Sequence, residues 1–158
     1  MILSGRDLAW YIQVGKLKIE PHVSTQFQQN GFDAILDYAQ DTHFEFKKGQ
    51  FYLVGTREVI TMPDDLMAFV ELRSTWARCG LLIPPTIIDA GFSGNLTLEV
   101  AAFADMPIPF GERFAHLVFA RLTGPADPYR GKYQGQRGVT GAVNEAVHCT
   151  SFSSASRD

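Results

Sequence analysis

Cysteine is scarce in this sequence, and its two cysteines are not placed for a shared task. Cys79 and Cys149 lie far apart, and the chain contains no CxxC pair. A disulfide framework or a cysteine-based metal site needs cysteines that are more numerous or more closely spaced. We therefore expect two reduced thiols, which is typical of a protein in a reducing compartment.

Long apolar runs and an excess of positive charge are also missing. No stretch approaches the roughly eighteen apolar residues of a membrane span, and residues 1–7 lack the pattern of a secretion signal. With 14 Lys and Arg against 17 Asp and Glu, the net charge is -3, which gives no long-range attraction to nucleic acid or an anionic membrane. A cytoplasmic protein without nucleic-acid or membrane partners is predicted. A small phosphorylated ligand is still compatible with this net charge, because binding it needs only a local arginine cluster.

Several catalytic motifs are absent as well. The chain has neither the HxE nor the PCxxC element by which zinc-dependent deaminases hold their metal, and it lacks Walker A and GxSxG sequences. The four histidines are scattered, with no two at ligand spacing: His22, His43, His116 and His148. Any hydrolytic chemistry would therefore rest on carboxylates and positioned water, without zinc.

What is present indicates a single all-β domain with one or two short helices. A chain of 158 residues that is 46% hydrophobic can bury one substantial core. Short β-branched and aromatic runs are separated by turn residues, and the expected strands are 18–19, 32–36, 44–46, 51–54, 58–62, 67–72, 95–103, 108–109 and 114–122. A helix should begin after Ser4 and end before Gly15, and a helical turn capped by Ser74 should be closed by Gly80.

The last part of the chain has a different composition. From Gly124 onward it is rich in Gly, Gln and Ser, a composition that predicts too little apolar burial for the segment to order itself. We assign residues 1–140 to one domain and residues 141–158 to a flexible C-terminal tail.

The first candidate constellation is RSTWAR at 73–78. In a helical turn, Ser74 and Arg78 stand four residues apart on one side, beside free backbone amides and Arg73. Hydroxyl, amide and guanidinium groups together suit a phosphate chain. A capped turn with two solvated arginines is the alternative that the pattern leaves open.

The second constellation is Asp89 to Gly94, followed by Glu99 on the next expected strand. Alternation along 95–101 places Leu96, Leu98 and Val100 on one face and Asn95, Thr97, Glu99 and Ala101 on the other. Phe92 offers a flat surface for a sugar or base. Asp89 and Glu99 could activate water and move protons. A hairpin with a polar outer face is the alternative, and the pattern by itself favours it.

The third constellation is the segment that contains Tyr129, Lys132, Tyr133 and Gln136. A flexible segment with a lysine, aromatic rings and an amide could fold over a bound triphosphate as a lid. A merely solvated tail is the alternative.

Taken in order, the three constellations resemble the dCTP deaminase family of the dCTP deaminase/dUTPase superfamily, and most of all its short archaeal-type members. RSTWARCGL at 73–81 resembles the family's RSSxARxGL, and IDAGFSGNLTLE at 88–99 resembles (I/V)D(P/A)GFxGxxTLE. PYRGKYQGQ at 128–136 resembles PYxGKYQGQ, and MILS at 1–4 and GFD at 31–33 also agree. The likeness covers roughly residues 1–140.

The resemblance implies a distorted β-barrel or jelly roll of the trimeric dUTPase-like type, assembled as a homotrimer with sites at subunit interfaces. It implies zinc-independent hydrolytic deamination of dCTP to dUTP and ammonia, which supplies dUTP and dUMP for thymidylate synthesis. Mg²⁺ would arrive on the triphosphate, and dTTP is a candidate feedback inhibitor.

The resemblance also implies residue roles. Glu99 matches the glutamate that activates water and passes its proton toward the departing ammonia, while Ser74 and Arg78 match residues that hold phosphates and position the water. Asp89 matches the carboxylate that binds the 3'-hydroxyl, and Phe92 matches the ring that packs on the sugar. The remaining implied substrate contacts are Arg73, Thr75, Ala77, Thr97, Leu98, Tyr129, Lys132 and Gln136.

Three departures and three rival functions stay open. The family's GxDLRxG loses its arginine in Ala34-Ile35-Leu36, His116 replaces a glutamine, and Thr75 replaces a serine. A dUTPase that forms dUMP and pyrophosphate is the first rival. A bifunctional deaminase and dUTPase, which the Asp89-Ala90-Gly91 variant resembles, is the second. A non-catalytic nucleotide-binding regulator is the third.

Overall fold

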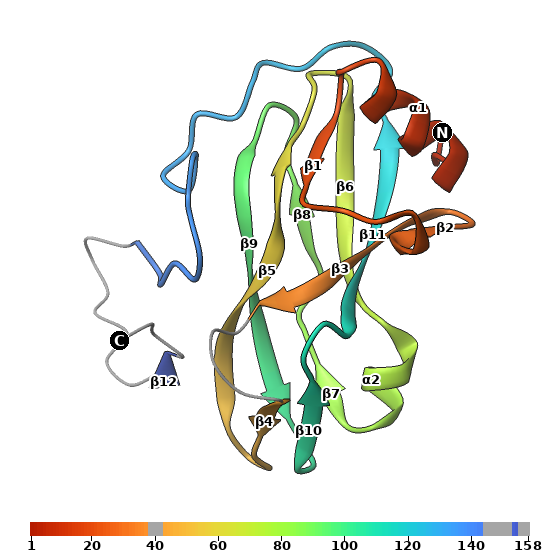
Figure 1. The fold of residues 1–158 in the computed structure, drawn as a ribbon. Helices are drawn as coiled ribbons and strands as arrows, with labels where there is room; N and C mark the ends of the chain where they lie inside the picture. Colours follow the sequence, from red (N-terminus) through yellow and green to blue (C-terminus); the bar gives the residue numbers. More distant parts are fainter. Residues whose placement is uncertain (38–42, 144–152, 155–158) are drawn as a thin grey trace.

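The structure, a computed structural model, describes residues 1–37, 43–143 and 153–154. It is mostly β, as predicted, with two short α-helices, α1 (Gly5–Gln13) and α2 (Ser74–Arg78), and one 3-10 helix, η1 (Ser24–Gln26) (Figure 1). The strands are β1 (Lys18–Glu20), β2 (Phe27–Gln28), β3 (Gly31–Asp37), β4 (His43–Phe46), β5 (Phe51–Thr61), β6 (Leu66–Leu72), β7 (Leu81–Leu82), β8 (Thr86–Ile88), β9 (Ser93–Ala102), β10 (Met106–Pro109), β11 (Arg113–Arg121) and β12 (Ser153–Ser154). No helix in these ranges is both long and apolar enough to cross a membrane.

One large sheet curls into an incomplete barrel. Its strands follow the order β7-β9-β5-β3-β11-β6-β8, with β1 and β12 added to β5 and β2 added to β3. A separate pair, β10 and β4, lies at the end of the molecule near α2 (Figure 1). Within the described residues, β8 pairs with β6 and not with β9, so the barrel has an open seam between β8 and β9. The predicted fold class is confirmed.

The barrel is filled by the inward faces of its strands. Phe32, Phe46, Phe114 and Phe119 are fully buried, and the rings of Phe46 and Phe114 stack with centroids 5.9 Å apart. Aromatic side chains remove large apolar areas from water, and this burial is the main source of stability in such a core.

Helix α1 follows the sequence prediction. The Ser4 hydroxyl accepts a hydrogen bond from the Asp7 backbone N–H at 3.2 Å, and the Asp7 carboxylate accepts one from the Ser4 N–H at 2.9 Å. The Ser4 hydroxyl also donates to the Asp7 carboxylate at 2.8 Å, and this bond, together with the one from the Ser4 N–H, lowers the pKa of Asp7. The two bonds that involve backbone N–H groups satisfy two amides at the helix start. The helix ends at Gln13, and Gly15 follows with φ of 74°, a conformation that favours glycine.

Two local predictions are wrong. The predicted strands 51–54 and 58–62 form the single strand β5, which ends at Thr61 and is interrupted by a bulge against β9 between Gly55 and Val59. A bulge breaks the alternation that marks a strand without ending it, so one strand has the sequence pattern of two. In α2 the N-cap is Arg73 rather than Ser74, and no side chain caps the turn.

The chain after β11 is also more ordered than its composition predicts. Residues 128–140 have no regular secondary structure, yet their amides bond to β9 and the turn before it: Tyr129 to Ala90, Gly135 to Ser93, Gly138 to Asn95 and Thr140 to Thr97. We call residues 128–143 the strap. The prediction that this region cannot order itself is wrong for 128–140, because β9 supplies the hydrogen-bond partners. The flexibility predicted for 141–158 falls mainly on residues outside the described ranges.

Candidate active site

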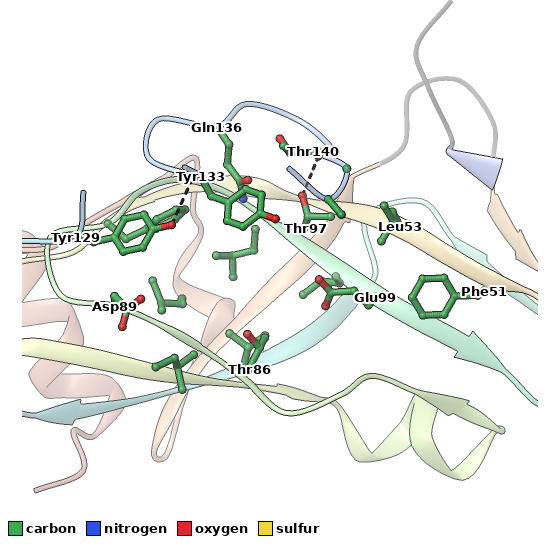
Figure 2. Close-up of a pocket in the computed structure, with 18 residues that line it drawn as sticks. Phe51, Leu53, Thr86, Asp89, Thr97, Glu99, Tyr129, Tyr133, Gln136 and Thr140 are labelled. Carbon is green, nitrogen blue, oxygen red and sulfur yellow. Dashed lines mark hydrogen bonds between the residues drawn. The ribbon is translucent and has the colours of Figure 1, made fainter. Parts of the chain in front are cut away.

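A pocket with a volume of about 380 Å³ lies in the open seam of the barrel. Strand β9 forms one wall, β8 and the residues after it form the other, and the strap lies across the mouth (Figure 2). The lining residues are Phe51, Leu53, Val70, Thr86, Ile87, Ile88, Asp89, Phe92, Leu96, Thr97, Leu98, Glu99, Tyr129, Tyr133, Gln136, Thr140, Gly141 and Ala142. The structure thus brings the second predicted constellation together with most of the third.

Glu99 is a half-buried carboxylate in this pocket. Its neighbours Leu98 and Val100 are buried, with 1% and 0% of their surfaces exposed, so the predicted alternation is confirmed and Glu99 points away from the core. Figure 2 shows Glu99 between Thr97 and Phe51. In the described part of the chain its side chain has no hydrogen-bond or ion-pair partner. Both oxygens are therefore available to a water molecule or ligand.

Asp89 and Phe92 lie at the other end of the same pocket. Asp89 is exposed and directly follows β8. Phe92 is buried, and its ring packs edge-on against Tyr129 with centroids 5.9 Å apart. Between them, Gly91 has φ of 75°, and a Cβ there would lie 2.7 Å from the Pro128 Cα. Glycine at this point lets the strap approach the pocket closely.

Of the three predicted substrate contacts in the strap, two line the pocket and one does not. Tyr129 and Gln136 line the pocket, and the Tyr129 hydroxyl accepts a hydrogen bond from the Tyr133 N–H at 3.3 Å (Figure 2). Lys132 is exposed and does not line it. Its ammonium donates to the Val143 carbonyl and lies 5.5 Å from the Tyr133 ring centroid. The role implied for Lys132 stays a prediction.

The first constellation is not brought to this pocket within one chain. Ser74, Thr75, Ala77 and Arg78 are all exposed on α2, which lies beside β7 and β10, away from the strap (Figure 1). None of them is among the lining residues. A phosphate site on α2 would therefore serve a ligand that approaches the surface of this chain from outside.

A buried carboxylate anchors the start of α2. Asp33 has 1% of its surface exposed, and its Oδ2 lies 3.2 Å from Arg73 Nε and 3.5 Å from Arg113 Nη1. The other oxygen, Oδ1, lies 2.8 Å from His116 Nδ1. Trp76 Nε1 also donates to the Arg113 carbonyl at 2.8 Å. His116, the departure from the family pattern, thus belongs to the cluster that holds Arg73 and does not line the pocket.

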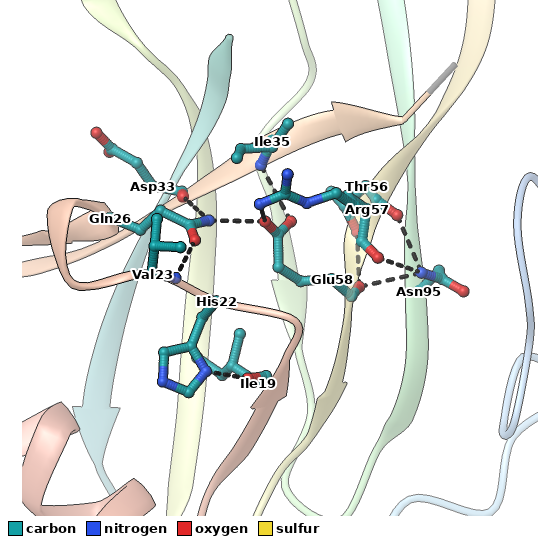
Figure 3. A network of polar contacts seen from close by, with 10 residues as sticks. All are labelled: Ile19, His22, Val23, Gln26, Asp33, Ile35, Thr56, Arg57, Glu58 and Asn95. Carbon is teal, nitrogen blue, oxygen red and sulfur yellow. Dashed lines mark hydrogen bonds and ion pairs between the residues drawn. The ribbon is translucent and has the colours of Figure 1, made fainter. Parts of the chain in front are cut away.

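A second buried carboxylate, Glu58, was not foreseen from the sequence. It is fully buried and accepts hydrogen bonds from Gln26 Nε2 at 2.7 Å and from the Ile35 N–H at 3.0 Å (Figure 3). Arg57 Nη2 lies 3.6 Å from it. Burial raises the pKa of Glu58, and the Ile35 and Gln26 hydrogen bonds and the Arg57 charge oppose that rise.

Several pocket residues were also missed, among them Phe51, Thr86 and Thr140. Tyr133 lines the pocket as well; the third constellation contained it, but no substrate contact was assigned to it. Phe51 and Thr86 reach the pocket only because β5 and β8 are brought to the two sides of the seam, and no local pattern shows that. In the described ranges, no three His, Cys, Asp or Glu side chains gather as a metal-binding group.

Comparison with known proteins agrees with this architecture. Two solved structures share the fold: a 2'-deoxycytidine 5'-triphosphate deaminase from Agrobacterium tumefaciens (TM-score 0.62, 20% identity, 77% of this chain and 47% of that one) and the EIAV dUTPase (TM-score 0.54, 22% identity, 73% and 98%).

Relatives in sequence are closer. A dCTP deaminase from Hyperthermus butylicus is 42% identical over 172 residues, covering 89% of this chain and 97% of its own. A probable deoxyuridine 5'-triphosphate nucleotidohydrolase from Sulfolobus islandicus rod-shaped virus 1 is 43% identical over 153 residues, with the same coverage. A family model described as dCTP deaminase-like matches residues 34–122, and the chain belongs to this dCTP deaminase-like family.

Proposed function

We propose that this protein deaminates dCTP hydrolytically to dUTP and ammonia, without zinc. The observation that carries the proposal is Glu99, whose oxygens have no partner among the described residues and which lies in the same pocket as Phe92 and Asp89. Relatives named dCTP deaminase, about 40% identical over most of the chain, support the same reaction.

In this reaction Glu99 moves two protons. Its carboxylate accepts a proton from water while the water oxygen adds to C4 of cytosine, and this proton is delivered to N3. Glu99 then takes the proton of the new C4 hydroxyl and gives it to the exocyclic amine. The C4–N bond breaks, its electron pair leaves on ammonia, and the C4 oxygen becomes the carbonyl of uracil. Asp89 binds the 3'-hydroxyl, and the ring of Phe92 packs on the deoxyribose.

We also infer that the working site contains residues of two chains in a homotrimer. Ser74 and Arg78 are exposed and absent from the pocket lining, so in this proposal α2 of a neighbouring copy supplies them. Their hydroxyl and guanidinium groups suit the triphosphate, and Mg²⁺ belongs to the substrate as its counterion.

A dTTP molecule has the same sugar and phosphates and would compete for the site. Such an enzyme would act in the cytoplasm and supply dUTP for thymidylate synthesis.

A second candidate is cleavage of dUTP to dUMP and pyrophosphate, alone or after deamination. The presence of Asp89 in the pocket of Glu99 supports this option, since a carboxylate there could activate water against phosphorus. The viral relative named a probable deoxyuridine triphosphate hydrolase supports it as well. A regulator that binds nucleotide without turning it over is the remaining alternative.

Two parallel incubations, one with dCTP and one with dUTP, separate these functions. Purified protein with dCTP and Mg²⁺ should yield dUTP and stoichiometric ammonia, and 1,10-phenanthroline, which removes zinc, should leave the rate unchanged. Formation of dUMP and pyrophosphate from dCTP would indicate the bifunctional enzyme. Hydrolysis of dUTP with dCTP untouched would indicate a dUTPase, and unchanged dCTP and dUTP would indicate the regulator.

A further inference from the structure

Asn95 connects the interior of the sheet to the strap. Its Nδ2 donates to the carbonyls of Thr56 at 2.9 Å and Glu58 at 3.1 Å (Figure 3), and its Oδ1 accepts from the Gly138 N–H at 3.0 Å. Only 7% of the residue is exposed. A carboxamide offers donors at one end and an acceptor at the other, so the two sets of partners require this kind of side chain and fix its orientation.

The sheet side of this connection is the bulge in β5. Gly55 pairs with Thr97 and Val59 pairs with Asn95, so four steps along β5 oppose two steps along β9. The intervening carbonyls lie outside the regular ladder, and a buried carbonyl without a partner is costly. The Asn95 amide supplies that partner, which means that the bulge orients Asn95 independently of the strap.

The strap side adds two backbone contacts at the same residue. The Asn95 N–H donates to the Gln136 carbonyl at 3.1 Å, and Gln136 Nε2 donates to the Asn95 carbonyl at 2.6 Å. The neighbouring Gly94 allows this approach, because a Cβ there would lie 2.9 Å from the Gln136 carbonyl oxygen. Gln136 is therefore held at Asn95 through both its backbone carbonyl and its side-chain amide.

The position of this contact relative to the pocket follows from strand geometry. Asn95, Thr97 and Glu99 alternate onto one face of β9, and each two-residue step advances about 7 Å. Thr140 N–H donates to Thr97 Oγ1 at 3.0 Å, one step closer to Glu99. Fixing Gly138 on Asn95 thus sets which strap residues lie over which part of the pocket.

We propose that Asn95 is a positioning residue that sets the register of the strap on β9 and so holds Gln136 at the pocket. It touches no reacting atom and acts through Gln136, and its kinetic consequence rests on the proposed function. Because the protein's own hydrogen bonds set this register, substrate binding does not have to order the strap from a free chain. In the family pattern (I/V)D(P/A)GFxGxxTLE, position 95 is one of the unspecified positions, so the motif itself does not assign this role.

The test combines amide hydrogen exchange with kinetics on Asn95→Ala. The amides of residues 136–140 should exchange at least about tenfold faster, while the Ile35 amide in the sheet interior changes less than about twofold. KM for dCTP should rise about tenfold with kcat within about threefold, because the lost contact assists binding rather than chemistry. Unchanged exchange in the strap, or a fall in kcat alone, would overturn the proposal.

Thr56→Val is the matched control, because Thr56 Oγ1 accepts from the Leu96 N–H at 3.0 Å in the same bulge and makes no hydrogen bond to the strap. Strap exchange should stay within about twofold of wild type. Equal loosening in both variants would mean that Asn95 acts only through sheet stability, and the proposal would fail.

Asn95→Ser serves if the alanine variant does not fold. Its short hydroxyl keeps a polar group at the site but cannot span both partner sets, so strap exchange should again rise, and unchanged exchange would overturn the proposal. The exchange measurement needs no substrate. If the wild-type protein had no deaminase activity while the variant still showed faster exchange in the strap, the proposed function alone would be overturned.

Discussion

Two glutamates on neighbouring strands have opposite surroundings. Glu58 on β5 is fully buried and accepts hydrogen bonds from Gln26 and Ile35, whereas Glu99 on β9 is half-buried in the pocket and has no partner in the described ranges. A carboxylate whose oxygens are already bonded stabilises local structure, and one with free oxygens facing a cavity is available for chemistry. The comparison shows that burial of a carboxylate alone does not identify a catalytic group.

The variant Glu99→Gln tests this difference between the two glutamates with the largest expected effect. Loss of the proton-transfer group should lower ammonia release about 10³-fold, while dCTP still binds and the melting temperature stays within about 2 °C. Measuring turnover, dCTP binding by calorimetry and thermal unfolding on one preparation checks all three. Near-normal turnover would remove Glu99 from the mechanism.

Glu58→Ala should show the reverse pattern. The Ile35 N–H and the Gln26 amide would lose their buried acceptor, which should lower the free energy of unfolding by about 3 kcal/mol. Urea denaturation measures that loss, and kcat per folded molecule should stay within about threefold of wild type. If stability were unchanged, the network in Figure 3 would not stabilise the fold.

A smaller effect concerns pH. Because burial raises the pKa of Glu58 in the folded protein, the folded state holds the proton more tightly than the unfolded chain does. Its contribution to stability is therefore present below the ordinary glutamate pKa and is lost as pH rises through the raised value. The melting temperature of the wild type minus that of Glu58→Gln should fall as pH rises from about 4 through the raised pKa of Glu58. A difference that is flat or grows with pH would contradict the raised pKa.

The sequence was sufficient wherever local pattern determines structure. The strict alternation of Leu96, Leu98 and Val100 with polar residues put Glu99 on the correct face of β9. The reciprocal side-chain and backbone pattern of Ser4 and Asp7 predicted the start of α1. Both features depend on residues within four positions of each other, where steric and hydrogen-bond rules act directly.

What the sequence could not show depends on contacts between distant segments. Asn95 was placed on the polar face of β9, yet it is buried because the β5 bulge and the strap both bond to it. The strap was expected to lack order because composition does not show that β9 has free partners for it. Equally, no local rule places Arg78 outside the pocket that holds Glu99, since that separation follows from how the whole sheet curls.

The central claim is that Glu99 of one chain acts with Ser74 and Arg78 of another, and subunit mixing tests it most directly. Glu99→Gln and Arg78→Ala should each be nearly inactive alone. Unfolded together in equal amounts and refolded, they should recover about a quarter of wild-type deamination, because random assembly gives one interface in four both intact partners. Activity no greater than the sum of the two separate variants would contradict the account.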